Sequence, residues 1–190
     1  MKGKLILVIG PTGSGKGTLL AQAKTDIPGL VFPVSCTTRA MRPGEASGQT
    51  YYFVSPEEFE SRVRAGEFLE WAEYGHNRYG TLKSEIIPAL ERGETVIREI
   101  EVQGARQIQE ILLPQNLRII YIDAGSWEEL ERRITARAPI GAPELEARRK
   151  RYQDETSFKA RADVVIENRD GGLESAKQEF ESAVRAIMRG

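Results

Sequence analysis

Residues Gly10-Pro11-Thr12-Gly13-Ser14-Gly15-Lys16-Gly17-Thr18 form a glycine-rich stretch near the start of the chain. An apolar run, residues 5–9, precedes this stretch directly, and a helical pattern over residues 16–26 follows it. A strand, a glycine-rich loop and a helix in this order are the context of a phosphate-binding loop. The glycines let backbone N–H groups point at one spot, while the helix N-terminus and Lys16 add positive charge. We therefore expect residues 10–18 to bind a triphosphate.

An ordinary strand-to-helix turn is the alternative interpretation of this stretch. Such a turn needs one or two glycines and has no use for a lysine at the helix mouth, so phosphate binding is preferred. The strict motif places Ser or Thr directly after the lysine, where the hydroxyl binds magnesium. Here Gly17 takes that place and Thr18 comes one residue later, so the role of Thr18 as a metal ligand stays open.

Apolar runs rich in Val and Ile predict five buried strands, at residues 5–9, 30–34, 95–100, 117–122 and 163–166. Apolar residues at helical spacing separate most of these runs, at residues 16–26, 83–92, 126–137 and 173–188. Ser126 followed by Glu129 is a capping box at the start of the third of these helices. Strands that alternate with helices predict an α/β fold with a parallel five-stranded sheet flanked by helices.

Two segments depart from this alternation. Residues 35–82 contain turn residues, a strand-like stretch at 50–54 and a helical pattern at 56–64, which together predict an inserted subdomain. Residues 138–160 become a highly charged helix with little apolar face, which predicts a mobile helical lid. We expect a single domain, residues 1–190, whose core comprises residues 1–34, 83–137 and 161–190.

Composition disfavours several classes of function. The 190 residues include 27 Lys and Arg against 28 Asp and Glu, a formal net charge of -1, which argues against binding to nucleic acid. The longest stretch without charge, residues 27–38, is interrupted by Pro and Gly and is too short to span a membrane. No secretory signal is apparent, so we expect a cytoplasmic protein. With one Cys and one His, neither a disulfide nor a structural zinc site is expected.

Further motifs lie in order along the chain: SCTTRAMRPGE at residues 35–45, GQTYYFV at 48–54, EFLEW at 67–71, YGT at 79–81, EIEVQGA at 99–105 and DVVIEN at 163–168. With the glycine-rich stretch, they make the chain resemble the guanylate kinases over essentially its whole length. The resemblance implies ATP-dependent phosphorylation of GMP, and of dGMP, with ADP as co-product, in purine nucleotide metabolism and GMP recycling. It also implies Mg²⁺ as the cofactor of ATP. We expect a monomer or a homodimer that has no nucleic-acid or membrane partner.

The resemblance makes residues 35–82 the GMP-binding insertion. Arg39 and Arg42 would present guanidinium forks to the GMP phosphate, and the hydroxyls of two tyrosines would complete its hydrogen bonds. Carboxylates would accept hydrogen bonds from the N1 and N2 donors of guanine, and hydroxyls would contact its O6 or N7. The implied GMP site comprises Ser35, Arg39, Arg42, Tyr51, Glu70, Tyr79, Thr81, Glu99 and Glu101. The alternative is that the arginines are solvated loop charges, the tyrosines are core residues and Glu70 is exposed.

On the ATP side, the resemblance selects Arg133, Arg137 and Arg149 as arginines that close on the phosphates. Arg148 is an alternative to Arg149, and many charges in this region are spaced four residues from an acid and could simply solvate a helix. Asn168 would line the adenine side. The implied catalytic residues are Lys16, Arg39, Arg137 and Arg149.

In the implied mechanism, the protein positions the reactants and neutralises phosphate charge. The acceptor is a phosphate oxygen that is mostly deprotonated at neutral pH, so no general base is required. Glu99 is a candidate partner for Mg²⁺, beside Thr18. Two other functions stay open: a guanylate kinase-like module that binds phosphorylated peptides, and a kinase for another nucleoside or sugar phosphate. The intact Lys16 argues against the first, and whether the N–H donors of guanine matter for binding discriminates the second.

Overall fold

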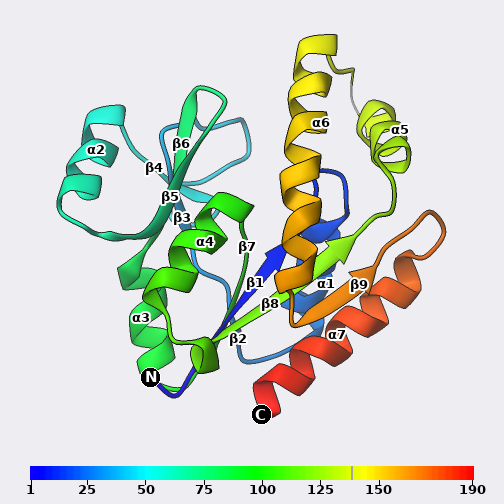
Figure 1. Cartoon of the computed structure of the whole chain (residues 1–190). Helices are drawn as coiled ribbons and strands as arrows, with labels where there is room; N and C mark the ends of the chain where they lie inside the picture. The colour runs from blue at the N-terminus through cyan, green and yellow to red at the C-terminus, as the bar shows by residue number, and fades with distance from the viewer. Residues whose placement is uncertain (138) are drawn as a thin grey trace. The chain divides into compact units, whose positions relative to one another are not determined.

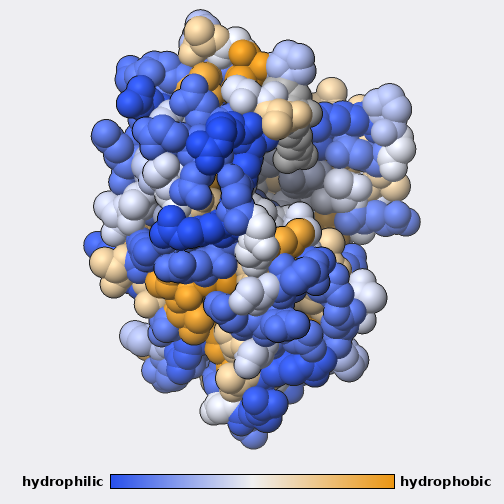
Figure 2. All heavy atoms as spheres, turned by 90° about the vertical axis from the view of Figure 1, so that its right-hand side faces the viewer, coloured by the Kyte–Doolittle hydropathy of each residue, from blue (hydrophilic) through white to orange (hydrophobic). Residues whose placement is uncertain are grey.

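A computed structural model describes residues 1–137 and 139–190 of the chain, without the side chains of Tyr74 and Arg137. The chain forms two compact units. Unit 1 comprises Met1–Leu5, Val31–Ile97 and Gln103–Leu117, and unit 2 comprises Ile6–Leu30, Arg98–Val102 and Arg118–Gly190. Hydrophilic residues cover most of the face shown in Figure 2, and hydrophobic residues gather in a few limited areas of it.

The main sheet has five strands in the order β2-β7-β1-β8-β9. They are β1 (Lys4–Ile9), β2 (Leu30–Val31), β7 (Thr95–Glu99), β8 (Leu117–Asp123) and β9 (Val164–Glu167). The predicted parallel five-stranded sheet flanked by helices is therefore confirmed, and β1 is fully buried from Leu5 to Val8. The prediction for β2 was too long: the strand ends before Pro33, which has no N–H to donate to a ladder.

Helices α1 (Lys16–Asp26), α5 (Trp127–Arg137), α6 (Ala142–Ser157) and α7 (Leu173–Arg189) belong to unit 2, with the 3-10 turn η2 (Phe158–Arg161). In Figure 1, α7 runs alongside β9, and it also packs on α1. The capping box at α5 is confirmed, because the Ser126 N–H donates to Glu129 Oε2 at 2.8 Å and the Glu129 N–H to Ser126 Oγ at 3.4 Å. These caps fix where α5 begins.

The charged helix α6 is held by a few contacts near its C-terminal end. The Tyr152 hydroxyl donates to the Gly125 carbonyl oxygen at 3.0 Å, and its ring lies 5.8 Å from that of Trp127. Tyr152 also packs on a small core formed by Ala124, Leu130 and Ile134. The predicted charged segment thus contains a helix, and Tyr152 gives this helix an apolar contact with the rest of unit 2.

Unit 1 contains a second sheet of four strands in the order β4-β3-β6-β5. The strands are β3 (Ser35–Thr37), β4 (Tyr51–Phe53), β5 (Phe68–Tyr74) and β6 (Asn77–Leu82). The predicted helix at residues 56–64 is α2 (Pro56–Arg64), whose N-cap Ser55 accepts from the Glu58 N–H. The remaining elements are α3 (Lys83–Glu91), α4 (Val102–Ile111) and the 3-10 turn η1 (Pro114–Asn116). Residues 35–82 therefore contain this four-stranded sheet and α2, and the bounds of the inserted subdomain stay a prediction.

The two faces of this small sheet differ in chemistry. One face carries an apolar core of Cys36, Phe59, Phe68 and Leu82. Side chains alternate along a strand, so the neighbours Ser35 and Thr37 lie on the other face. The other face is thus free to carry polar groups. No helix among the described residues is long and apolar enough to cross a membrane.

Candidate active site

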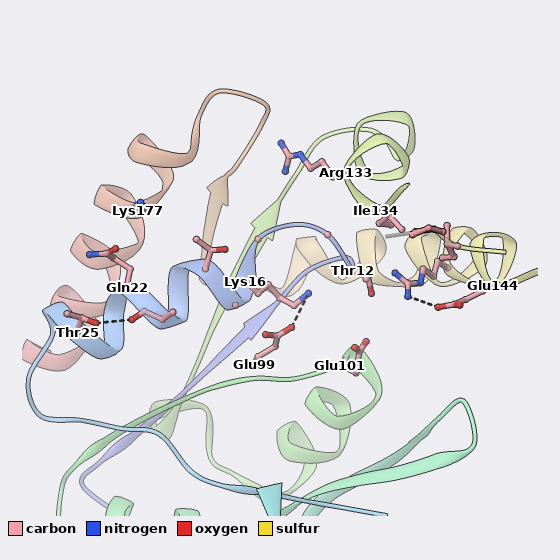
Figure 3. A pocket seen from close by; sticks show the side chains of 18 residues that line it. Thr12, Lys16, Gln22, Thr25, Glu99, Glu101, Arg133, Ile134, Glu144 and Lys177 are labelled. Carbon is pink, nitrogen blue, oxygen red and sulfur yellow. Dashed lines mark hydrogen bonds and ion pairs between the residues drawn. The ribbon is translucent and has the colours of Figure 1, made fainter. Parts of the chain in front are cut away.

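The glycine-rich loop between β1 and α1 folds around its own lysine. Lys16 is 6% exposed, and its Nζ donates to the carbonyl oxygens of Gly10 at 2.6 Å and Pro11 at 3.0 Å. The same Nζ lies 3.5 Å from Oε1 of Glu99 at the end of β7. Figure 3 marks this ion pair with a dashed line. The loop therefore holds an ammonium group at the mouth of a helix, which is the arrangement that attracts a phosphate.

Three glycines of the loop, Gly10 (φ +151°), Gly13 and Gly15, adopt backbone conformations that side chains disfavour. Gly13 has φ +90° and Gly15 has φ +92°, and a Cβ at Gly15 would overlap Nδ2 of Asn168. That Nδ2 donates to the Ser14 carbonyl oxygen at 2.8 Å, and Asn168 is only 5% exposed. Asn168, which the resemblance placed beside adenine, thus supports the loop from behind and is not among the residues that line the pocket.

A pocket of about 1350 Å³ opens in front of the loop within unit 2. It is lined by loop residues, by one side of α1, by the end of β7 and by residues of α5, α6 and α7. From the predicted triphosphate site it includes Thr12, Gly13, Gly15, Lys16, Gly17 and Thr18, while Gly10, Pro11 and Ser14 lie outside the lining. Glu99 and Glu101 also line it, near Lys16 (Figure 3).

The predicted lid arginines differ in whether they line the pocket. Arg133 lines the pocket; its Nε donates to Asp170 Oδ1 and one of its terminal nitrogens to the Asn168 carbonyl oxygen, both at 2.8 Å. Arg148 lines the pocket from α6 and forms a 2.6 Å ion pair with Glu144. Arg149 is exposed and is not part of the lining, and both Arg148 and Arg149 stay predictions as phosphate ligands. The side chain of Arg137 lies outside the described residues.

A buried carboxyl of α6 reaches this pocket region. Glu155 is 6% exposed, and burial, followed by the negative charge of Glu101, raises the pKa of Glu155 to about 7. Its hydrogen bond to Glu101 also raises this pKa, whereas Lys16 and Arg151 lower it. The sequence analysis did not predict a role for Glu155. Glu155 is three residues from Tyr152 and from the buried Phe158, and this spacing, which places the three on one helix face, could have indicated that Glu155 is buried.

In unit 1, Arg39 is held in a fixed orientation. Its two terminal nitrogens donate to Glu45 Oε2 at 3.0 Å and Oε1 at 2.8 Å, and the guanidinium lies 5.4 Å from the ring of Tyr51 and 5.5 Å from that of Phe53. The hydrogen bond from Arg39 is the main reason that the pKa of Glu45 is lowered. The sequence motifs assigned no role to Glu45, because they indicate residues that bind phosphate and not the residues that orient those ligands.

Glu45 also organises the neighbouring predicted phosphate ligands. The Arg42 N–H donates to Glu45 Oε2 at 2.8 Å, so one carboxylate joins both arginine positions. The rings of Tyr51 and Tyr79 meet edge to face with centroids 5.9 Å apart. The structure therefore gathers Arg39, Tyr51 and Tyr79 at one place and brings the Arg42 backbone to the same carboxylate.

The predicted base-reading residues Ser35, Thr81 and Glu70 form a row across three strands of the small sheet, and Tyr51, predicted for the phosphate, continues it on the fourth strand. Ser35 pairs with Tyr51 on one side and with Thr81 on the other, and Thr81 in turn pairs with Glu70. The Thr81 hydroxyl donates to a carboxylate oxygen of Glu70, which is 4% exposed. Glu70 is therefore not the exposed carboxylate of the alternative interpretation. The other two predicted GMP residues, Glu99 and Glu101, belong to unit 2.

A parallel α/β sheet with a lysine-bearing glycine loop between its first strand and helix is the arrangement of the P-loop proteins, which bind the phosphates of nucleotides. Comparisons with known proteins specify it further: the family model described as guanylate kinase matches residues 2–187. The chain belongs to the guanylate kinase family, an enzyme family that phosphorylates GMP using ATP.

Individual relatives agree along the whole length. A guanylate kinase of Rubrobacter xylanophilus is 41% identical over 189 residues, which cover 100% of this chain and 97% of the relative. A guanylate kinase of a Synechococcus strain is 42% identical over 95% of this chain and 82% of its own length. The crystal structure of the guanylate kinase from Anaplasma phagocytophilum matches with a TM-score of 0.75 and 30% identity, covering 99% of this chain and 87% of that one.

Proposed function

We propose that this chain transfers the terminal phosphoryl group of ATP directly to GMP, and also to dGMP, within purine nucleotide metabolism and GMP recycling in the cytoplasm. The observation that carries the proposal is the row of Tyr51, Ser35, Thr81 and Glu70 across the small sheet. Glu70 is buried and already accepts one hydrogen bond, and a carboxylate has further lone pairs for the N–H donors of guanine. A base without those donors would leave this buried carboxylate under-satisfied, which costs affinity.

The donor nucleotide would bind in the pocket of unit 2. Lys16 would exchange its contacts with the Gly10 and Pro11 carbonyl oxygens for phosphate oxygens, and Arg133 and Arg148 would add charge from α5 and α6. Arg137 and Arg149 remain proposals of the resemblance. In unit 1, Arg39 would hold the acceptor phosphate in the orientation that Glu45 and the two aromatic rings preset.

The residues beside Lys16 fit a magnesium ion that arrives with the nucleotide. Magnesium takes one or two carboxylates together with substrate phosphates and keeps several waters. Glu99 and Thr18 line the pocket, whereas the described residues contain no cluster of three or more His, Cys, Asp and Glu side chains. When bound, the ion would neutralise charge on the transferring phosphoryl group. No base is needed, because a phosphate with a second pKa of about 6 is mostly deprotonated at pH 7.

Formation of ADP from Mg-ATP tests the proposal, with GMP, dGMP, AMP, CMP and UMP offered separately and Lys16→Ala as the control. We expect transfer to GMP and dGMP, a loss of at least a hundredfold in the control, and little transfer to the other nucleotides. Transfer to AMP or a pyrimidine nucleotide in preference to GMP would point to another acceptor. Folded protein that transfers to none of them would favour the peptide-binding module. Gel filtration of the same sample distinguishes the monomer from the homodimer.

The role of Glu70 has its own test. Glu70→Gln keeps the shape of the side chain but replaces one acceptor oxygen by a donor NH₂, which faces the N–H groups of guanine. We expect the preference for GMP over AMP, measured as the ratio of kcat/KM values, to fall by about tenfold or more. Glu73→Gln, an exposed position on the same strand, is the matched control. An unchanged preference in folded Glu70→Gln protein would remove Glu70 from the guanine site.

A further inference from the structure

The open edge of the small sheet carries a contact that the proposed GMP site does not use. β5 is an outermost strand of that sheet, and its Trp71 exchanges two hydrogen bonds with one side chain of α4. The Trp71 N–H donates to Gln107 Oε1 at 3.2 Å, and Gln107 Nε2 donates to the Trp71 carbonyl oxygen at 2.8 Å. The Gln107 amide therefore takes the place that the backbone of a further strand would occupy.

This contact lies beside an irregularity in the pairing of β5 with β6. Phe68 pairs with Leu82, but Glu70 pairs with Thr81, so Leu69 is an extra residue in β5. In a regular strand, residues two apart face the same side, and Glu70 would share the side of Phe68. Phe68 packs in the apolar core, whereas Glu70 bonds to Thr81. The bulge at Leu69 is thus what separates a core side chain from a base-reading one.

A bulge interrupts the ladder locally and leaves its extra residue unpaired, and a slip of the pairing by one residue would exchange the faces of the strand. The backbone of Trp71, the residue after Glu70, is held from outside by Gln107. We propose that Gln107 is a positioning residue for guanine recognition, which clamps β5 beyond its bulge and so keeps Glu70 beside Thr81. This inference rests on the proposed function, because Gln107 acts on GMP through Glu70.

Steady-state kinetics of Gln107→Ala, with Gln107→Glu as a variant of the same shape, test the clamp. Gln107→Glu keeps an acceptor for the Trp71 N–H but loses the donor to its carbonyl oxygen. For both variants we expect the KM for GMP to rise about five- to tenfold, as the loss of an effective hydrogen bond would produce. The kcat at saturating GMP and the KM for ATP should stay within about twofold of wild type, because the pocket around Lys16 is untouched.

Two comparisons separate positioning from a merely structural effect. Gln115→Ala removes an exposed glutamine of the same unit and should leave every constant unchanged. Placed in a Glu70→Gln background, Gln107→Ala should raise the KM for GMP by less than about twofold, because the group that it positions is already altered.

The experiments distinguish a failure of the clamp from a failure of the proposed function. An unchanged KM for GMP in folded Gln107→Glu protein overturns the inference. So does a rise in the KM for GMP on Gln107→Ala substitution that is equal in the wild-type and the Glu70→Gln backgrounds. A parallel fall in kcat or rise in the KM for ATP also overturns it, because general destabilisation then explains the data. Wild-type protein assayed alongside reports on the proposed function itself: if it does not phosphorylate GMP, that function fails, and if it does while the variants match it, the clamp alone fails.

Discussion

Glu155 couples the protonation of one side chain to the stability of unit 2. Its side chain is buried among Glu101, Lys16 and Arg151, and its pKa is raised to about 7, against about 4.3 for an unperturbed Glu. The folded state therefore binds this proton more tightly than the unfolded state does. Stability from this group is fully present below pH 4 and is lost as the pH rises to about 7.

The variant Glu155→Gln, which keeps a neutral side chain at every pH, should remove this loss. We expect wild type to be less stable than the variant at pH 8 by up to about 3 kcal/mol, and the difference to shrink or reverse at pH 5. Urea unfolding at the two pH values measures it. Glu146→Gln, at an exposed position of the same helix, should show no such dependence. A difference between wild type and Glu155→Gln that is independent of pH would contradict the assignment.

Among the helices and strands, the features that depend on neighbouring residues could be predicted from the sequence better than the pairing of distant segments. The apolar run of β1, the limits of α1 and α2 and the capping box of α5 follow from spacing and caps, which act within a few residues. The hairpin of β5 and β6 carries mixed polar and aromatic residues without regular alternation, so neither its pairing nor the bulge at Leu69 could be predicted. The clamp by Gln107 joins segments 36 residues apart and leaves no local signal.

The start of α1 offers a contrast between two neighbouring glycines. A Cβ at Gly17 would meet no described heavy atom within 4 Å, and its backbone is helical, whereas Gly15 has φ +92° and lies against Asn168. We expect Gly17→Ala to raise the free energy of unfolding by up to about 1 kcal/mol. Gly15→Ala should lower it by more than about 1 kcal/mol, because it adds backbone strain and displaces Asn168. Thermal unfolding of both variants checks the prediction, and an equal sign for the two would contradict it.

Over the whole chain, most of the predicted acceptor site lies in a different compact unit from the predicted donor site. The loop and the arginines of α5 and α6 lie in unit 2, together with Glu99 and Glu101 of the predicted GMP site, and the other predicted GMP residues lie in unit 1. Motifs in the sequence located both sets because their residue types are distinctive: glycines with a lysine, paired arginines, tyrosines and acids. The supporting residues Glu45, Glu155 and Gln107 were not found, since each acts by contacting another side chain or backbone group and its residue type alone does not mark it.

The two-faced sheet of unit 1 has a consequence for how base preference can change. The residues of the row and the residues of the apolar core alternate along the same strands, so the two sets lie on opposite faces of the sheet and do not pack against each other. Substitutions at Ser35 or Thr81 should alter the proposed base-reading surface and leave the packing around Cys36 and Phe59 intact. The preference for one acceptor nucleotide is therefore open to gradual change by point substitution. A single inserted or deleted residue near Leu69 would instead turn the side chains of β5 to the opposite faces of the sheet, and would abolish both the apolar packing and the base-reading row.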